Sequence, residues 1–299
     1  MIKNFGEIIE RGQQNSPKII AVSGAHDRDV LMSVKKAKAL KIAESILIGD
    51  VEVINSVAQE NNIDIADFKK IHVKDLKEAS EKAVELVKTK KADILMKGLV
   101  DNAIILKAAL NKEKGIRKKK VLSHVGVFEI AGFDKLILAT DTAMNIDPDV
   151  NTKKEIINNV LEVTTKLGIN TPRVGIVCAK EIVSDKMPET LEAKELVDSY
   201  KAGEIKGCMV GGPFALDNAI SIKAAEVKKI EDPVAGRADV LLVPDVEAGS
   251  ILYKSMIYFA KAKTAGIILG AEVPLVLTSR ADSWDTKLYS IALATLLSE

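Results

Sequence analysis

The stretch Leu277-Thr278-Ser279-Arg280-Ala281-Asp282-Ser283-Trp284-Asp285 joins an apolar run to a helical one near the end of the chain. Residues 273–278 are typical of a strand, and the polar residues follow where a C-terminal helix is expected to begin. Loops at the carboxyl ends of strands are where α/β proteins bind ligands. Arg280 is notable in a chain rich in Lys, because only Arg offers a rigid fork that grips phosphate or carboxylate with two parallel hydrogen bonds. The stretch predicts an α/β fold with an anion-binding loop.

Short apolar runs alternate with longer amphipathic runs over the rest of the chain, the pattern of βαβ units around a parallel or mixed sheet. Strands are predicted at 19–22, 45–48, 71–73, 94–96, 121–128, 136–139, 174–178, 240–243, 267–269 and 275–277. Helices with Lys and Glu on the outer face are predicted at 29–43, 75–90, 152–167 and 189–200. A length of 299 residues suggests two domains, with no repeat or long Pro/Gly linker between them.

The composition and motifs of the chain limit which ligands it can bind and in which compartment it is expected. The formal net charge is +1, so no global field favours nucleic acid or an acidic membrane surface. Cys178 and Cys208 each lie in an apolar run, which does not resemble a disulfide framework and favours a reducing, cytoplasmic setting. No signal-peptide pattern and no apolar run of about 18 residues is present. The absence of a Walker loop and of a Gly-x-Gly-x-x-Gly turn after the first strand disfavours ATP and NAD.

Two polar turns follow strands in the first half of the chain. Lys97-Gly98 precedes Asp101-Asn102 at a helix start, which indicates an anion site or, alternatively, a turn with an extended Lys and Asp101 as the helix cap. Ser123-His124 begins a long apolar strand, and His124 is either catalytic or a hydrogen-bonded structural group. Metal binding is poorly supported there, because no Cys or second His is near in sequence.

Three further turns carry candidate ligand groups. Asp141 follows a strand and can orient a catalytic cation or stabilise a turn. Gly212-Pro213 permits close approach of a ligand, although Gly-Gly-Pro is also an ordinary chain reversal. The loop containing Glu247, followed by Lys254 on a helical run, can hold a nucleotide-like group or simply cap a helix.

These motifs together resemble the phosphate acetyl/butyryltransferase family, and its butyryl-transferring members most closely. Their order and spacing along nearly the whole chain are more specific than any one motif. The matching stretches are 95–101, 122–125, 140–141, 186–188, 205–208, 212–213 with 215–217, 253–254 and 277–283. The resemblance implies reversible transfer of a short-chain acyl group, butanoyl, between coenzyme A and inorganic phosphate, giving acyl phosphate and free coenzyme A. It implies no metal in the chemistry and no bound cofactor.

The resemblance also implies the architecture. Two three-layer α/β lobes are expected around a cleft, as in isocitrate and isopropylmalate dehydrogenases. Residues 1–122 and 273–299 would form the first lobe and residues 123–272 the second, so that the C-terminal segment returns to the first lobe. A cytoplasmic homo-oligomer, a dimer or larger, is expected for such an enzyme.

For the site, the resemblance implies that Ser279 and Arg280 are catalytic, together with Asp282 or Asp285 as the base. The base position of the acetyl-transferring branch aligns with Thr286, so one of these two carboxylates or water would take the proton. Lys107 replaces an expected Arg, Asn102 an expected Thr, and Gly211 an expected acidic residue. The predicted substrate-binding residues are Lys97, Gly98, Asn102, Lys107, Ser123, His124, Asp141, Gly212, Pro213, Glu247 and Lys254.

Three alternatives stay open on the sequence. Acetyl can be the acyl group, because one methylene changes discrimination by only about 1 to 3 kcal/mol. A metal- and NAD-dependent decarboxylating dehydrogenase can share the fold, but it would need a cluster of metal-binding Asp residues and a nucleotide loop. A non-enzymatic binding protein is the third alternative, and the intact Ser279-Arg280 pair argues against it.

Overall fold

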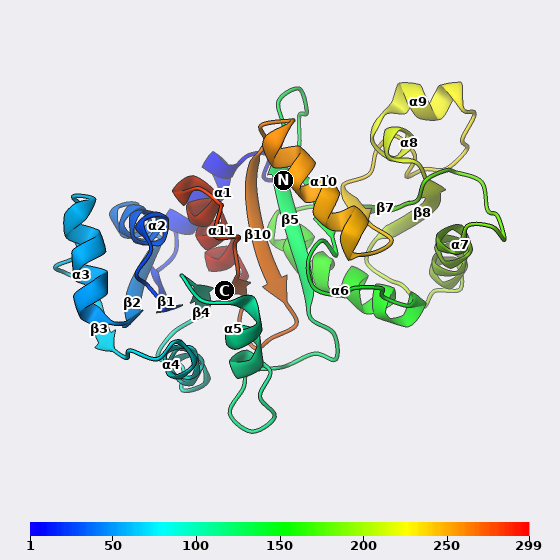
Figure 1. Cartoon of the computed structure of the whole chain (residues 1–299). Helices are drawn as coiled ribbons and strands as arrows, with labels where there is room; N and C mark the ends of the chain where they lie inside the picture. Colours follow the sequence, from blue (N-terminus) through cyan, green and yellow to red (C-terminus); the bar gives the residue numbers. More distant parts are fainter. Residues whose placement is uncertain (299) are drawn as a thin grey trace. The chain divides into compact units, whose positions relative to one another are not determined.

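The computed structural model describes residues 1–298 and divides the chain into two compact α/β units (Figure 1). Unit 1 comprises Met1–Asn4 and Val121–Lys263, and unit 2 comprises Phe5–Lys120 with the segment from Thr264 onward. The α/β class and the return of the C-terminal segment to the first part of the chain are therefore confirmed. The domain limits 1–122 with 273–299 and 123–272 stay a prediction, because spatial grouping does not establish which parts fold independently.

Unit 2 contains a mostly parallel sheet with the strand order β3-β2-β1-β4-β11-β10, in which only β10 runs antiparallel to its neighbour β11. Its strands are β1 Lys18–Ser23, β2 Ala43–Gly49, β3 Lys69–His72, β4 Ile94–Lys97, β10 Lys263–Leu269 and β11 Leu275–Val276. The chain moves outward from β1 through β2 to β3 and then returns to the other side of β1 as β4. The carboxyl ends of β1 and β4 therefore form a topological switch point, the place where open α/β sheets bind ligands.

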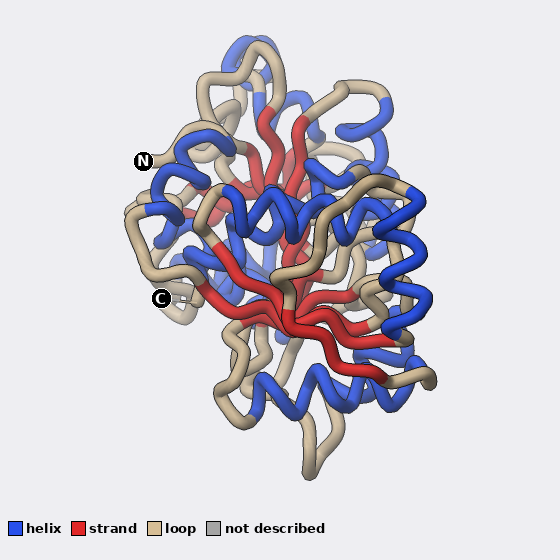
Figure 2. The backbone as a smooth tube through the Cα atoms, turned by 90° about the vertical axis from the view of Figure 1, so that its left-hand side faces the viewer, coloured by secondary structure: helices blue, strands red, loops and turns tan. Residues whose placement is uncertain are grey.

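Helices cover both faces of this sheet. They are α1 Phe5–Gln13, α2 Arg28–Ala39, α3 Val51–Glu60, α4 Leu76–Lys88, α5 Asn102–Ala109 and α11 Trp284–Leu297. The C-terminal helix α11 (red in Figure 1) packs against α1 and α2 (blue), although more than 240 residues separate α2 from α11 along the chain. On the other face, α4 and α5 pack together against the strands. Figure 2 shows the strands (red) enclosed between helices (blue).

Unit 1 contains five paired strands in the order β5-β6-β9-β7-β8, with a single antiparallel pair, β5 with β6. The strands are β5 Ser123–Glu129, β6 Ile137–Thr140, β7 Arg173–Val177, β8 Met209–Phe214 and β9 Val240–Leu242. The helices are α6 Val150–Lys166, α7 Pro188–Lys201, α8 Leu216–Ile220, α9 Ile222–Val227 and α10 Val246–Tyr258. Both cysteines lie buried and free in this unit, as the sequence predicted.

The interpretation of Gly211-Gly212-Pro213 as a chain reversal is wrong, because these residues lie within strand β8. A proline cannot donate to a sheet ladder, but β8 ends the strand order of unit 1, where this loss is tolerated. A Cβ at Gly211 would lie 2.5 Å from Oδ1 of Asp232, so no side chain fits there. This steric limit explains why no acidic residue stands at position 211.

No helix among residues 1–298 is both long enough and apolar enough to cross a membrane.

The buried stack of Phe5 on Tyr289 ties α1 to α11, with ring centroids 4.5 Å apart. We expect Phe5→Ala to lower the free energy of unfolding by about 3–5 kcal/mol, because it leaves a cavity where an aromatic ring was packed. Urea denaturation measures this loss. Val53→Ala, at an exposed position of α3, is the control and should change stability by at most about 0.5 kcal/mol. Equal losses for the two variants would contradict the role of Phe5 in this packing.

Candidate functional site

The switch point of unit 2 is built by an unusually close contact between the turns that follow β1 and β4. The Gly98 N–H donates to the Ser23 carbonyl at 2.8 Å, and the Leu99 N–H donates to the Gly24 carbonyl at 2.8 Å. A Cβ at Gly98 would lie only 2.2 Å from the Gly24 oxygen. Glycine is required at position 98 for this backbone contact, whereas a contact between Gly98 and a ligand stays a prediction.

Lys97 ends β4 at this point, and its side chain is almost fully buried, with 4% exposed. Among residues 1–298 its ammonium group has no hydrogen-bond partner. Burial lowers the pKa of Lys97, and the nearby positive charges of Arg280 and Lys287 lower it further, while Asp282 and Asp101 oppose this effect. Lys97 is therefore a largely buried lysine beside two other cations.

Arg280 lies in the turn after β11, and its guanidinium forms an ion pair with Asp101. Asp101 is the residue before α5 and makes no capping hydrogen bond with its side chain, so the predicted cap serves as a charge partner instead. Both side chains are open to solvent, with 55% and 67% exposed. Because β11 pairs with β4 in parallel, the predicted catalytic Arg280 and the predicted Lys97 lie in one cluster.

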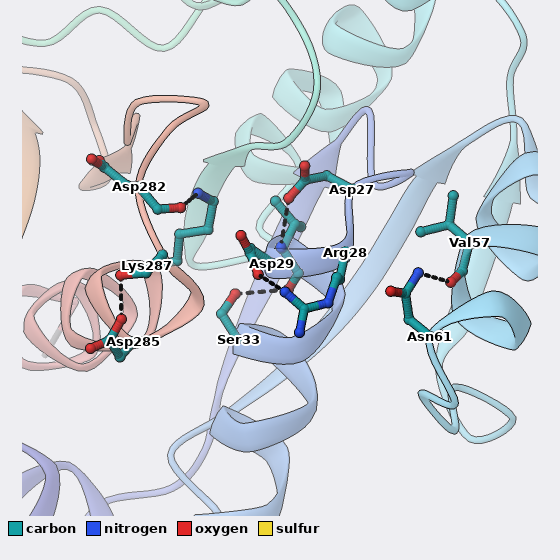
Figure 3. Close-up of polar contacts among 11 residues, drawn as sticks. Asp27, Arg28, Asp29, Ser33, Val57, Asn61, Asp282, Asp285 and Lys287 are labelled. Carbon is teal, nitrogen blue, oxygen red and sulfur yellow. Dashed lines mark hydrogen bonds and ion pairs between the residues drawn. The ribbon is translucent and has the colours of Figure 1, made fainter.

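Lys287, on the first turns of α11, fixes the shape of the Arg280 turn, and the sequence analysis missed it. Its side chain is 3% exposed, and its ammonium donates to the backbone carbonyl of Ser279 at 3.3 Å. It also donates to the backbone carbonyl of Asp282 (Figure 3). The Asp282 carboxylate in turn accepts the Ser279 N–H at 2.8 Å. A lysine within an otherwise apolar helix was the available signal. These bonds hold Ser279 and Arg280 in a defined turn.

The candidate bases are engaged in local structure. Asp285 accepts a hydrogen bond from the Ser283 hydroxyl, and Asp282 holds the Ser279 turn. Thr286, at the position aligned with the base of the acetyl branch, is buried. The Thr278 hydroxyl, just before Ser279, is also buried and has no hydrogen-bond partner within residues 1–298. This hydroxyl is a further group that a ligand at the turn can use, and it was not predicted.

The cluster defined by Lys97, Asp101, Arg280, Asp282 and Lys287 is here called the cationic cluster. It combines three cationic side chains with two carboxylates. An excess of positive charge in a partly buried place favours a bound anion, and the Arg fork suits phosphate.

Two other predicted residues of unit 2 lie on α5. Asn102 is its first residue, next to Asp101, and is exposed. Lys107 is exposed in the last turn, about 7.5 Å further along the helix axis. The structure therefore places Asn102 beside the cationic cluster, and it records no contact of Lys107 with that cluster.

In unit 1, the predicted residues His124 and Asp141 meet in a buried network. The Asp141 carboxylate accepts the backbone N–H groups of His124, Ala143, Met144 and Asn145 and the Asn145 side-chain amide. Nδ1 of His124 lies 2.6 Å from the hydroxyl of Thr142. Ser123 contacts the Asn159 amide at 3.0 Å. Asp141 therefore stabilises the turn after β6, the alternative that the sequence left open.

His124 is held in its neutral form. Burial lowers its pKa to about 4, against the opposing charge of Asp141. The edge of its ring meets Tyr253 of α10, with centroids 5.5 Å apart, and Tyr253 also contacts Phe128. A Cβ at Gly126 would lie 2.9 Å from the Tyr253 ring, so this glycine makes room for the packing.

The remaining predicted residues of unit 1 are spread out. Lys254 and Glu247 are exposed on α10, where Lys254 contacts the Ser250 hydroxyl at 2.6 Å. Gly212 and Pro213 lie on β8, four strand positions from β5, or roughly 19 Å at the usual strand spacing. The structure therefore does not bring Gly212 and Pro213 to the network around His124.

No group of three or more His, Cys, Asp or Glu side chains able to hold a metal ion is found in the described part of the chain.

Comparisons with known proteins agree on one family. Residues 68–295 match the family model described as "Phosphate acetyl/butaryl transferase". The phosphate butyryltransferase of Clostridium beijerinckii is 45% identical over 297 residues, which cover 99% of this chain and 98% of that protein.

Solved structures agree with the fold. A branched-chain phosphotransacylase from Enterococcus faecalis superposes with a TM-score of 0.84 at 35% identity, covering 94% of this chain and 99% of that one. A 4-hydroxythreonine-4-phosphate dehydrogenase from Klebsiella pneumoniae has a TM-score of 0.57 at 12% identity, covering 95% of this chain and all of that one. The latter likeness concerns the fold alone and agrees with the predicted dehydrogenase-like architecture.

The neutral state of His124 predicts a pH dependence of stability. Its pKa falls from about 6.5 in the unfolded chain to about 4 in the folded one, so its contribution is complete above pH 6.5 and is lost as the pH falls toward 4. Between pH 7 and pH 5 we expect the free energy of unfolding of the wild type to fall by about 2 kcal/mol more than that of His124→Asn. Urea denaturation at both pH values measures this difference. A pH dependence in His124→Asn equal to that of the wild type would contradict the assignment.

Proposed function

We propose the following function for this chain, which belongs to the phosphate acetyl/butaryl transferase family: it transfers a short-chain acyl group, butanoyl, reversibly between coenzyme A and inorganic phosphate. The products in one direction are acyl phosphate and free coenzyme A. The relative from Clostridium beijerinckii, named a phosphate butyryltransferase and matched over nearly the full length of both chains, supports butanoyl. The observation that carries the proposal in the structure is the cationic cluster at the switch point of unit 2.

Arg280 is the proposed phosphate ligand. Its ion pair with Asp101 is exposed, and such pairs contribute only about 0–1 kcal/mol. A phosphate dianion can therefore replace Asp101 and form two parallel, charge-assisted hydrogen bonds with the guanidinium. The same contacts would orient the attacking oxygen and stabilise charge that grows as it bonds to the acyl carbonyl.

Ser279 is the proposed partner of the acyl group. Its backbone is held at both ends, by Lys287 at the carbonyl and by Asp282 at the N–H. A fixed hydroxyl beside Arg280 can donate to the carbonyl oxygen as the tetrahedral intermediate forms. Coenzyme A then leaves as a thiolate, which is tolerable near neutrality for a thiol with a pKa of about 8.5. Positioning and charge stabilisation are thus the main contributions of the protein.

The other predicted residues keep proposed roles in binding substrates. These are Gly98, Asn102, Lys107, Ser123, His124, Asp141, Gly212, Pro213, Glu247 and Lys254. We further propose a cytoplasmic homo-oligomer that needs no metal or resident cofactor, with coenzyme A only as substrate and product. The buried, free cysteines are compatible with a reducing compartment.

Acetyl is the alternative acyl group. The family description names both acetyl and butyryl transfer, and a pocket wall that differs by one or two methylenes changes discrimination only modestly.

Release of free thiol from acetyl-, butyryl- and branched acyl-coenzyme A tests the proposal, with and without phosphate, in the presence of a chelator and without nicotinamide. We expect thiol release that depends on phosphate, fastest with butyryl-coenzyme A. No such release from any of the three substrates would refute the proposed activity. A faster reaction with the acetyl substrate would instead support the alternative acyl group.

Arg280→Lys tests the proposed bidentate contact of the guanidinium with phosphate in the same assay. We expect kcat/KM to fall by at least about tenfold, or 1.4 kcal/mol, because lysine keeps the charge but loses the bidentate geometry. Arg11→Lys, on the exposed surface of α1, is the matched control and should retain wild-type activity. A wild-type rate in Arg280→Lys would show that the fork does not bind the reacting phosphate.

A further inference from the structure

The cationic cluster contains one group that the proposed reaction has not yet used. The Lys97 side chain, at the carboxyl end of β4, is 4% exposed, and its amine makes no hydrogen bond to any of residues 1–298. The other two cations are committed: Arg280 pairs with Asp101, and Lys287 donates to two backbone carbonyls. An amine at the end of a largely buried side chain, with no hydrogen bond to the described protein and beside the proposed phosphate ligand, is available to act on the phosphate itself.

The charges around Lys97 suit a group that exchanges protons. It faces Arg280 and Asp282 from the turn after β11, Lys287 from α11, and Asp101 from the residue before α5. Burial and the two cations lower the pKa of Lys97 more than the two carboxylates raise it. Arg280 stays charged under all ordinary conditions, so a phosphate dianion has a counter-charge even when Lys97 is neutral.

The reaction requires such a group. Hydrogen phosphate carries a proton that must leave as one of its oxygens bonds to the acyl carbon, because the product is an acyl phosphate. The carboxylates nearby are poor candidates for this task, since Asp282 accepts the Ser279 N–H and Asp285 accepts the Ser283 hydroxyl.

We propose that Lys97 is the general base that removes the proton of hydrogen phosphate during its attack on the thioester, and the general acid that returns it in the reverse reaction. In the forward step the phosphate O–H bond breaks and an N–H bond forms at Nζ. The phosphate oxygen bonds to the acyl carbon, the C–S bond breaks, and the sulfur leaves with the electron pair as thiolate. In reverse, the thiolate attacks and the departing phosphate takes the proton from the Lys97 ammonium.

This assignment deepens the proposed function and rests on it. It requires neutral Lys97 for attack by phosphate, so the forward kcat should rise as the pH increases through the pKa of Lys97. The reverse step requires protonated Lys97 and should lose this contribution over the same range. The ionisation of phosphate also affects the rate, but this effect is common to every variant.

Lys97→Arg separates a base from a simple positive charge, because arginine keeps the charge but cannot accept a proton. We expect its forward kcat to fall at least about 10²-fold, with KM for phosphate changed much less, and its pH profile to lack the rising limb assigned to Lys97. Lys77→Arg, on the exposed surface of α4, is the matched control and should keep the wild-type rate and profile.

Lys97→Ala with added small primary amines provides the second readout, because an amine that enters the space left by the side chain can replace the missing base. We expect partial recovery of the forward rate that depends on the pKa of the amine and on the fraction of its free base. Thermal unfolding of each variant distinguishes loss of fold from loss of chemistry, and recovery by an amine itself requires a folded protein.

The outcomes are distinct. An active wild type together with a Lys97→Arg variant that keeps its rate and pH profile would overturn the role of Lys97 and leave the proposed function intact. A folded Lys97→Ala variant that no amine rescues would also overturn it. A wild type without phosphate-dependent thiol release would overturn the proposed function, and the role of Lys97 with it.

Discussion

The backbone contact between Gly98 and Gly24 is the constraint on which the candidate site depends. It brings the ends of β1 and β4 closer than any side chain at position 98 would allow, and two hydrogen bonds hold it there. The contact fixes where β4 ends, and therefore where Lys97 is buried and where Asp101 precedes α5. Because β11 pairs with β4 in parallel, the same arrangement brings Arg280 to Asp101.

A partly buried cationic cluster is electrostatically unfavourable without a bound anion, since like charges repel and each loses hydration. The structure limits this cost in three ways. Lys287 donates hydrogen bonds to two backbone carbonyls. Arg280 is exposed and forms an ion pair with Asp101. The pKa of Lys97 is lowered. The site is thus arranged for a ligand that supplies the missing negative charge.

Particular residues show which parts of the fold and of the candidate site the sequence patterns predicted. The alternation of strands and helices and the Ser279-Arg280 turn were predicted correctly, because hydrophobic periodicity and turn chemistry are local properties. Strand β8 was misread because Gly-Gly-Pro is typical of turns. Its place at the end of the strand order explains the proline, and the proximity of Asp232 explains Gly211. The sequence allowed Asp141 either to orient a catalytic cation or to stabilise a turn. The structure favours the turn, because the carboxylate accepts five hydrogen bonds from groups around it.

The sequence by itself determined the α/β class, the family resemblance and the turn at Ser279-Arg280, since each depends on residues that are close together or in a recognisable order. Only the tertiary structure decided that Lys97 lies beside Arg280 and Lys287, which are more than 180 residues away along the chain. It alone decided that Lys97 has no partner while Asp282 and Asp285 do. The physical reason is that burial and the surrounding charge set the protonation of a side chain, and both come from strands and helices that the fold brings together.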